Sequence, residues 1–99
     1  MGSSCVYILY SEKLDKYYVG STEDIVLRLH IHNNPHETRK FTAKGLPWLL
    51  KCTIDCPDKT SSTVLERKIK SMKSRKLIEQ LIANASFRAE FSKPFTPDC

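Results

Sequence analysis

The amino-acid sequence predicts an α+β fold, with a small, mostly antiparallel three-stranded sheet flanked by helices. Two runs rich in β-branched and aromatic residues, 5–10 and 17–20, are separated by a short polar stretch and indicate a hairpin. A third such run covers 48–54, and the apolar residues after it recur at helical spacing. The expected order is therefore strand, strand, helix, strand, helix, helix.

The segment after the hairpin has the pattern of a helix. Ser21 and Thr22 precede Glu23-Asp24, and acidic residues in a first turn are favoured by the helix dipole. We expect the helix to run to Asn33, because Asn34-Pro35 then stops it. Its predicted core-facing arc consists of Ile25, Val26 and Leu29.

A polar loop over 34–47 leads to the third strand, which Pro57-Asp58 ends. A second helix is predicted from Ser62 or Thr63, and a third helix is predicted with Ser74 as its N-cap. The expected apolar positions are Leu65, Ile69 and Met72 on the second helix, and Leu77, Ile78, Leu81 and Ile82 on the third.

The end of the chain lacks a clear hydrophobic period. From Ala85 onward we expect a loop, packed back on the domain through Phe87, Phe91 and Phe95. A chain of 99 residues can bury one modest core. We therefore predict one domain over residues 5–83, followed by a C-terminal tail over 84–99.

Composition narrows the class of protein. Charged residues make up 27% of the chain and apolar residues 40%, which is ordinary for a globular domain and argues against disorder. The formal charge of +5 suits a polyanionic partner, most commonly nucleic acid, although a basic surface also serves solubility alone. No apolar run approaches the roughly 18 residues of a membrane span, and the first residues do not have the pattern of a secretory signal.

Cysteine spacing argues against a zinc site. Cys52 and Cys56 are separated by three residues, and the histidines lie well upstream, so paired zinc ligands are not present. Without an export signal, we expect a cytoplasmic protein whose four cysteines, Cys5, Cys52, Cys56 and Cys99, are reduced thiols.

A set of polar and aromatic residues recurs in a recognisable order. Cys5-Val6-Tyr7 on the first strand is followed by Tyr18-Val19-Gly20 on the second, and then by Arg28, His32 and Glu66 on the helices. This ordered set resembles the signature of the GIY-YIG nucleases, in particular the short stand-alone members related to the N-terminal nuclease module of UvrC-type repair subunits.

The match has departures from the family pattern. Cys5 replaces the first glycine, and Val6 and Val19 replace isoleucines, but the reactive groups belong to the tyrosines. Some family members also carry a late Asn, for which Asn84 is a candidate without a firm alignment.

The resemblance implies a metal-dependent endonuclease that hydrolyses phosphodiester bonds in DNA. By analogy with the family, Tyr7 is the expected base and Tyr18 orients the water or the phosphate. Glu66 supplies a carboxylate suited to one hard cation, Mg²⁺ or Mn²⁺. Arg28 offers a forked, permanent cation for the scissile phosphate. A phenol that acts as a base needs nearby cations, which Arg28, His32, Lys40 or Lys44 can supply.

A basic surface beside this set is expected to hold the nucleic-acid backbone. Contacts of this kind supply affinity without sequence preference. The residues predicted to make them are Arg39, Lys40 and Lys44 in the loop, and Lys70 and Lys73 on the second helix.

Each of these residues also has a purely structural interpretation. Tyr7 and Tyr18 can pack across the sheet as ordinary strand aromatics, and Gly20 can simply end a strand. Arg28 can pair with Asp24 one turn earlier, and His32 can sit on the surface near a helix end. Glu66 has the most serious structural alternative, because Thr63-Val-Leu-Glu66 has the pattern of a capping box.

Two rival functions follow from these interpretations. One is a catalytically silent nucleic-acid-binding module on the same fold, and the other is a protein-interaction domain with incidental charge. For a nuclease, the sequence does not separate DNA from RNA, or repair from mobile-element and defence roles.

Overall fold

Three strands form one antiparallel sheet in the order β2-β1-β3. They are β1 (Ser4–Ser11), β2 (Lys16–Thr22) and β3 (Trp48–Cys56). The computed structural model describes residues 3–34 and 44–95. The predicted α+β fold is confirmed, with each strand longer than its sequence signal indicated.

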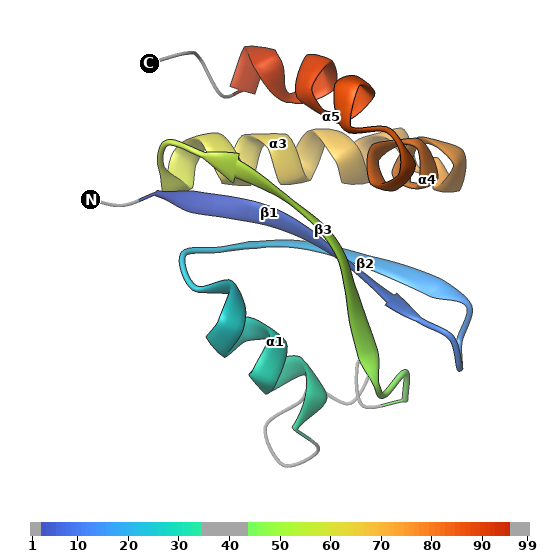
Figure 1. Cartoon of the computed structure of the whole chain (residues 1–99). Helices are drawn as coiled ribbons and strands as arrows, with labels where there is room; N and C mark the ends of the chain where they lie inside the picture. The colour runs from blue at the N-terminus through green and yellow to red at the C-terminus, as the bar shows by residue number, and fades with distance from the viewer. Residues whose placement is uncertain (1–2, 35–43, 96–99) are drawn as a thin grey trace.

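Helices cover both faces of this sheet (Figure 1). On one face lies α1 (Ile25–Asn33), and on the other lie α3 (Lys59–Met72), α4 (Arg75–Ala83) and α5 (Ala85–Ser92), with a short 3-10 turn, η1 (Lys93–Phe95). The central strand β1 is buried from both sides, which explains its nearly continuous apolar run.

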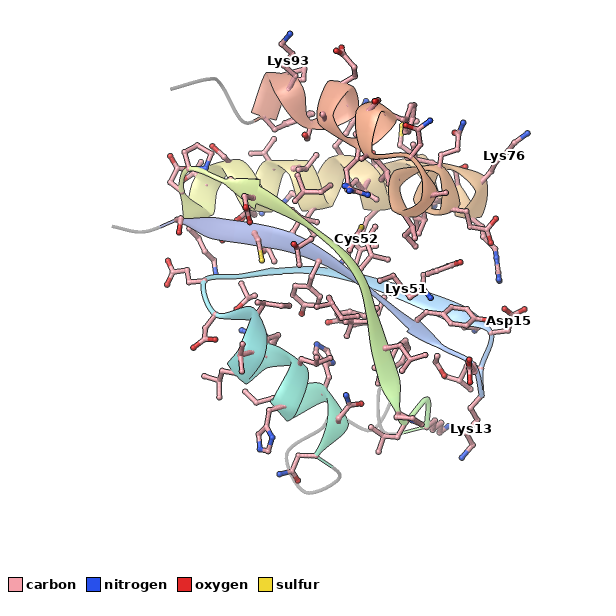
Figure 2. All side chains as sticks on the ribbon, viewed as in Figure 1. Lys13, Asp15, Lys51, Cys52, Lys76 and Lys93 are labelled. Atoms are coloured by element: carbon pink, nitrogen blue, oxygen red, sulfur yellow. The ribbon has the colours of Figure 1, made fainter. Side chains whose placement is uncertain are left out.

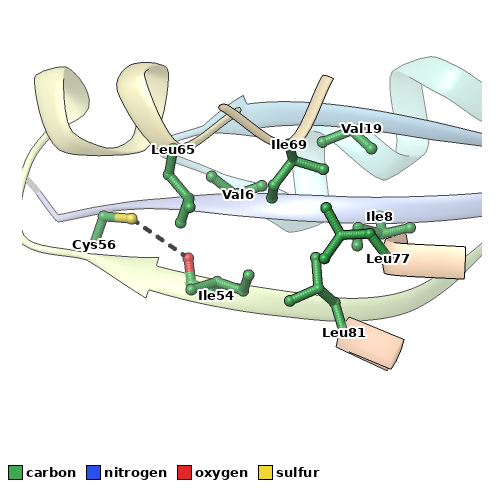
Figure 3. Close-up of a cluster of buried hydrophobic side chains, with 9 residues drawn as sticks. All are labelled: Val6, Ile8, Val19, Ile54, Cys56, Leu65, Ile69, Leu77 and Leu81. Carbon is green, nitrogen blue, oxygen red and sulfur yellow. Dashed lines mark hydrogen bonds between the residues drawn. The ribbon is translucent and has the colours of Figure 1, made fainter. Parts of the chain in front are cut away.

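Alternate residues of β1 enter two separate clusters. Val6 and Ile8 point toward α3 and α4, where they pack with Leu65, Ile69 and Leu81 (Figure 3). Tyr7 and Leu9 point toward α1 and pack with Trp48. Burying each large aliphatic side chain of the first cluster contributes about 1.5–3 kcal/mol, so this cluster is a major source of stability.

The start of α1 differs slightly from the prediction. Asp24 is the N-cap, and its carboxylate accepts from the Leu27 N–H at 3.0 Å. Ile25 and Leu29 pack on the smaller cluster as expected. Val26 does not, because it lies on the outer side of the helix with 78% of its surface exposed.

α3 begins earlier than predicted, at Lys59 instead of Ser62 or Thr63. Asp58 is the N-cap and accepts from the Ser61 N–H at 2.7 Å, so the helix begins at Lys59. Glu66 therefore lies in the middle of α3, and the predicted capping box from Thr63 is wrong. Met72 is 45% exposed, since the apolar cluster continues from Ile69 to Leu77 of α4 instead.

The prediction for α4 is confirmed, and the prediction of a loop after it is wrong. Ser74 caps α4 by accepting from the Leu77 N–H at 3.0 Å, as predicted. The tail from Ala85 is a helix, α5, capped by Asn84, rather than the expected loop. Its Phe87, Phe91 and Phe95 do pack on the large cluster, and their spacing of one helical turn was the signal for this helix.

Two sequence predictions concern the state of the cysteines and the membrane-spanning potential of the helices. Cys5, Cys52 and Cys56 are free thiols. Within residues 3–34 and 44–95, no helix is long and apolar enough to cross a membrane.

The junction between α3 and α4 depends on a residue in an unusual conformation. Lys73 has φ 46° and ψ 43°, in the left-handed region, and its N–H bonds to the Lys70 carbonyl at 3.2 Å. Glycine is the residue that usually occupies this position after a helix, because it lacks the Cβ that makes the conformation costly.

Lys73→Gly is expected to raise the free energy of unfolding by about 1 kcal/mol, because it removes this left-handed strain. Lys76→Gly, within α4, is the matched control and should lower the free energy of unfolding by about 1 kcal/mol. Urea denaturation of both variants measures the two effects. A destabilised Lys73→Gly variant would contradict the expectation.

Candidate active site

The hairpin places two tyrosines on the face covered by α1. Tyr7 pairs with Gly20 across the strands, and Leu9 pairs with Tyr18. Side chains alternate along a strand, so both phenol rings lie on the same face as Leu9. Their centroids are 6.3 Å apart, and the ring planes are inclined by 21°.

Gly20 makes room for the ring of Tyr7. A Cβ on Gly20 would lie 2.5 Å from the Tyr7 hydroxyl oxygen and 2.6 Å from Cζ of the same ring. Because Tyr7 is 1% exposed, its ring has little space in which to move away. Gly20 therefore does more than end a strand, because its lack of a side chain leaves the space that the Tyr7 phenol occupies.

His32 of α1 completes a three-residue cluster with the tyrosines. The Tyr7 hydroxyl and His32 Nε2 are hydrogen-bonded at 3.0 Å, with the donor set by the histidine tautomer. The Tyr18 and His32 rings are 4.7 Å apart in an edge-to-face arrangement. His32 is 7% exposed, so its interpretation as a surface histidine is wrong.

The position of His32 depends on the next residue, Asn33. The Asn33 amide donates to the Trp48 carbonyl at 3.0 Å and accepts from the Trp48 N–H at 2.6 Å. These two bonds join the end of α1 to the start of β3, and the Trp48 ring lies 6.1 Å from that of Tyr18. Sequence reasoning missed Asn33, whose one signal was an amide side chain at the end of a helix.

Arg28 extends from the exposed side of α1. Asp24, its predicted partner, uses its carboxylate to cap the helix. In the part of the chain that the structure describes, no carboxylate lies within 4.0 Å of the Arg28 guanidinium, so the predicted ion pair is wrong. The cation is available for an anionic ligand.

Glu66 approaches the cluster from the other helical layer. Its side chain is 20% exposed and forms an ion pair with Lys70 at 2.7 Å. The Lys70 ammonium also lies 5.8 Å from the centroid of the Tyr18 ring. Since β2 is an edge strand packed on α3, this pair lies beside Tyr18 at the margin of the sheet.

The pKa of Tyr7 responds to three of the other candidate residues, Tyr18, Arg28 and Glu66. Burial raises the pKa of the Tyr7 phenol well above its ordinary value of 10, and the nearby Tyr18 and Glu66 raise it further. Arg28 acts in the opposite direction and lowers this pKa. The expected help from Arg28 therefore exists, but burial outweighs it, and Tyr7 is a neutral phenol.

Glu66 is suited to one hard divalent cation. The described residues contain no group of three His, Cys, Asp or Glu side chains that could hold a metal ion together. Magnesium retains several waters and takes phosphate oxygens as ligands, so one partly exposed carboxylate fits it. The ion pair between Glu66 and Lys70 is worth only about 0.3–0.5 kcal/mol.

The structure describes three of the five residues that were predicted to contact the nucleic-acid backbone. Lys44, Lys70 and Lys73 are exposed, and the last two lie near Tyr18 at the end of α3. Arg39 and Lys40 fall outside the described residues.

Comparison with protein families identifies the fold and its signature. The family model named GIY-YIG catalytic domain matches residues 3–79. The chain belongs to the GIY-YIG family. No curated protein matches it significantly.

Membership of the GIY-YIG family confirms the resemblance seen in the sequence and gives this chain a nuclease-type fold. The matched segment contains every residue of the tyrosine–histidine cluster, together with Arg28 and Glu66. α5 lies outside the matched segment.

Gly20→Ala is expected to displace the Tyr7 ring and break its hydrogen bond to His32. The overpacked variant should lose roughly 1–3 kcal/mol of unfolding free energy. Ser21→Ala, one position along β2, is the control and should change stability little. Denaturation and the side-chain NMR signals of His32 measure both effects. Unchanged His32 signals in Gly20→Ala would contradict this role for the glycine.

The raised pKa of Tyr7 makes stability depend on alkaline pH. The folded state holds the phenol proton more tightly than the unfolded state does, so the stabilisation is complete below pH 10 and is lost as pH rises further. Wild type should therefore lose more stability than Tyr7→Phe as the pH rises above about 10.

Phenolate absorbance provides the direct measurement. Tyr7→Phe should remove the phenol with the largest rise in pKa, which burial causes. The control Tyr10→Phe should retain it, because the pKa of Tyr10 is raised less, chiefly by its hydrogen bond to Asp15. Loss of this late-ionising phenol in Tyr10→Phe but not in Tyr7→Phe would assign the shift to the wrong residue.

Proposed function

We propose that this protein is a metal-dependent endonuclease that hydrolyses phosphodiester bonds in DNA. The observation that carries the proposal is the buried Tyr7–His32 hydrogen bond, flanked by Tyr18 and acted on by Arg28 and Glu66. Packing alone needs neither an unpaired guanidinium nor a carboxylate at the margin of a tyrosine–histidine pair. Phosphodiester hydrolysis needs both, because charge builds on the phosphate while water loses a proton.

Arg28 is proposed to bind the scissile phosphate. Its guanidinium is permanently charged, has no carboxylate partner among the described residues, and projects from the helix that also carries His32. A forked contact to two phosphate oxygens would orient the phosphorus and neutralise charge as the water attacks.

Tyr7 and His32 are proposed to remove the proton from the attacking water. A neutral phenol is a poor base by itself, but it can accept a proton while giving its own to a neighbour. In this relay, the water proton moves to the Tyr7 oxygen as the Tyr7 proton moves to His32 Nε2, 3.0 Å away. The water oxygen then bonds to phosphorus, and the bond from phosphorus to the leaving oxygen breaks. Solvent water protonates the leaving group, and the imidazolium returns its proton to solvent.

This relay makes the raised pKa of Tyr7 compatible with catalysis. The phenol remains neutral until a water is positioned, so no buried phenolate has to be maintained. Tyr18 is proposed to orient that water or a phosphate oxygen, since its ring contacts that of His32, the partner of the Tyr7 hydroxyl.

Glu66 is proposed to hold the single metal ion, Mg²⁺ or Mn²⁺. When bound there, the ion would supply positive charge that stabilises the negative charge developing on the phosphate in the transition state. Glu66 would release Lys70 in exchange, which leaves the ammonium free to contact the nucleic acid.

Plasmid nicking tests the proposal. Glu66→Gln and Tyr7→Phe should each lower the rate by about 10²-fold or more, because each removes a group that acts on the reacting atoms. Glu90→Gln, on the exposed side of α5, makes the same chemical change as Glu66→Gln and should cleave like wild type.

Circular dichroism separates loss of chemistry from loss of fold in these variants. Full cleavage by Glu66→Gln would contradict the metal site. Absence of cleavage by wild type on supercoiled, single-stranded and branched DNA, with binding retained, would favour the silent binding module instead.

A further inference from the structure

A pocket of about 470 Å³ lies where β2 meets the junction of α3 and α4. One wall is the edge strand, and the other is formed by the end of α3 and the start of α4. Its lining residues are Lys16, Tyr17, Tyr18, Val19, Ile69, Lys70, Lys73, Ser74, Arg75 and Ile78.

The charged residues that line the pocket are all basic. Four of its lining residues are cations, and none is an acid. Lys70 and Arg75 are paired with carboxylates outside the lining. Lys16 and Lys73 have no carboxylate within 4.0 Å among residues 3–34 and 44–95. Two unneutralised ammonium groups across one hollow favour an anion with repeated charges.

Arg75 has a different task from the lysines. It donates to the Asp15 carbonyl at 2.9 Å, to the Asp15 carboxylate at 2.7 Å and to Glu79 at 3.1 Å, and its guanidinium lies 5.1 Å from the Tyr17 ring centroid. These contacts join the hairpin to α4 and hold the two walls of the pocket together. The pocket is therefore formed before any ligand binds.

The pocket shares Tyr18 with the candidate active site. Tyr18 lines the pocket and also contacts His32, with ring centroids 4.7 Å apart. Lys70 lines the pocket and also binds Glu66. A polymer whose phosphate lies beside Tyr7 and Glu66 can thus continue along β2 toward Lys16.

Lys73 is an unexpected residue for its backbone conformation. It adopts the left-handed region, where glycine is better suited, and it is one of the residues that line the pocket. A strained residue is easier to understand where its side chain performs a function that glycine cannot.

We infer that this pocket binds the sugar–phosphate backbone of the substrate DNA strand next to the scissile phosphate, with Lys16 and Lys73 as the phosphate contacts. The inference rests on the proposed nuclease function for the direction of the strand, but the binding itself needs no catalysis. It adds Lys16, which was not among the residues predicted to contact the nucleic-acid backbone.

Binding of a fluorescently labelled DNA oligonucleotide in EDTA tests the inference without cleavage. The double variant Lys16→Gln/Lys73→Gln should bind about tenfold more weakly, and the slope of log affinity against log salt should fall by about 1.8 on duplex or about 1.4 on single-stranded DNA. The control Lys51→Gln/Lys93→Gln removes the same charge from β3 and η1, at two residues that do not line the pocket (both labelled in Figure 2), and should change both quantities much less.

Lys73→Gly adds a readout that a structural role would not produce. It should bind DNA more weakly than wild type while unfolding at a higher urea concentration, because strain is relieved as a phosphate contact is lost. Weaker binding that merely followed lower stability would count against a direct contact.

The outcomes distinguish this inference from the proposed function. Equal losses in the pocket and control variants, or no binding by wild type at low salt, overturn the pocket. If the pocket variants lose binding but Glu66→Gln cleaves normally, the pocket stands and the proposed metal site fails. If Glu66→Gln loses cleavage while the pocket variants bind like wild type, the reverse holds.

Discussion

The packing of the Tyr7 ring on Gly20 is the contact on which the candidate site depends. A side chain at position 20 would occupy the space of the phenol, so the glycine and the tyrosine form one unit across two strands. The same ring position allows the bond to His32, and Asn33 holds the end of that helix against β3. Three separate elements are thereby joined at one phenol oxygen.

Burial and charge compete at that oxygen, and burial wins. Arg28 favours the phenolate, but desolvation together with Tyr18 and Glu66 keeps the proton on Tyr7. A site of this kind suits a proton relay better than a permanently charged base. The neutral phenol is then a consequence of the packing that positions it. In the proposed relay, His32 is the group that accepts its proton.

The edge strand β2 contributes to both clusters of buried side chains, through Val19 on one face and Tyr18 on the other. The large apolar cluster lies between the sheet and α3–α4, while the smaller cluster, which contains Tyr7, lies between the sheet and α1. Tyr18, on the edge strand, lies at the boundary between them. Glu66 and Lys70 reach this boundary from α3, and the basic pocket follows it to the α4 junction. Lys73 shows the cost of this arrangement, since a left-handed lysine is retained where a glycine would be more stable.

The sequence by itself determined the fold class, the three strands, the first helix and the ordered set from Tyr7 to Glu66. These follow from local periodicity and from residue order, which need no knowledge of distant contacts. Only the tertiary structure decided that Asp58 caps α3, that the tail forms α5, and that burial keeps Tyr7 neutral. It also revealed Asn33 at the site, and it brought Lys16 and Lys73 to one pocket. Caps, desolvation and pockets depend on groups brought together by packing, so residues far apart in the chain settle them.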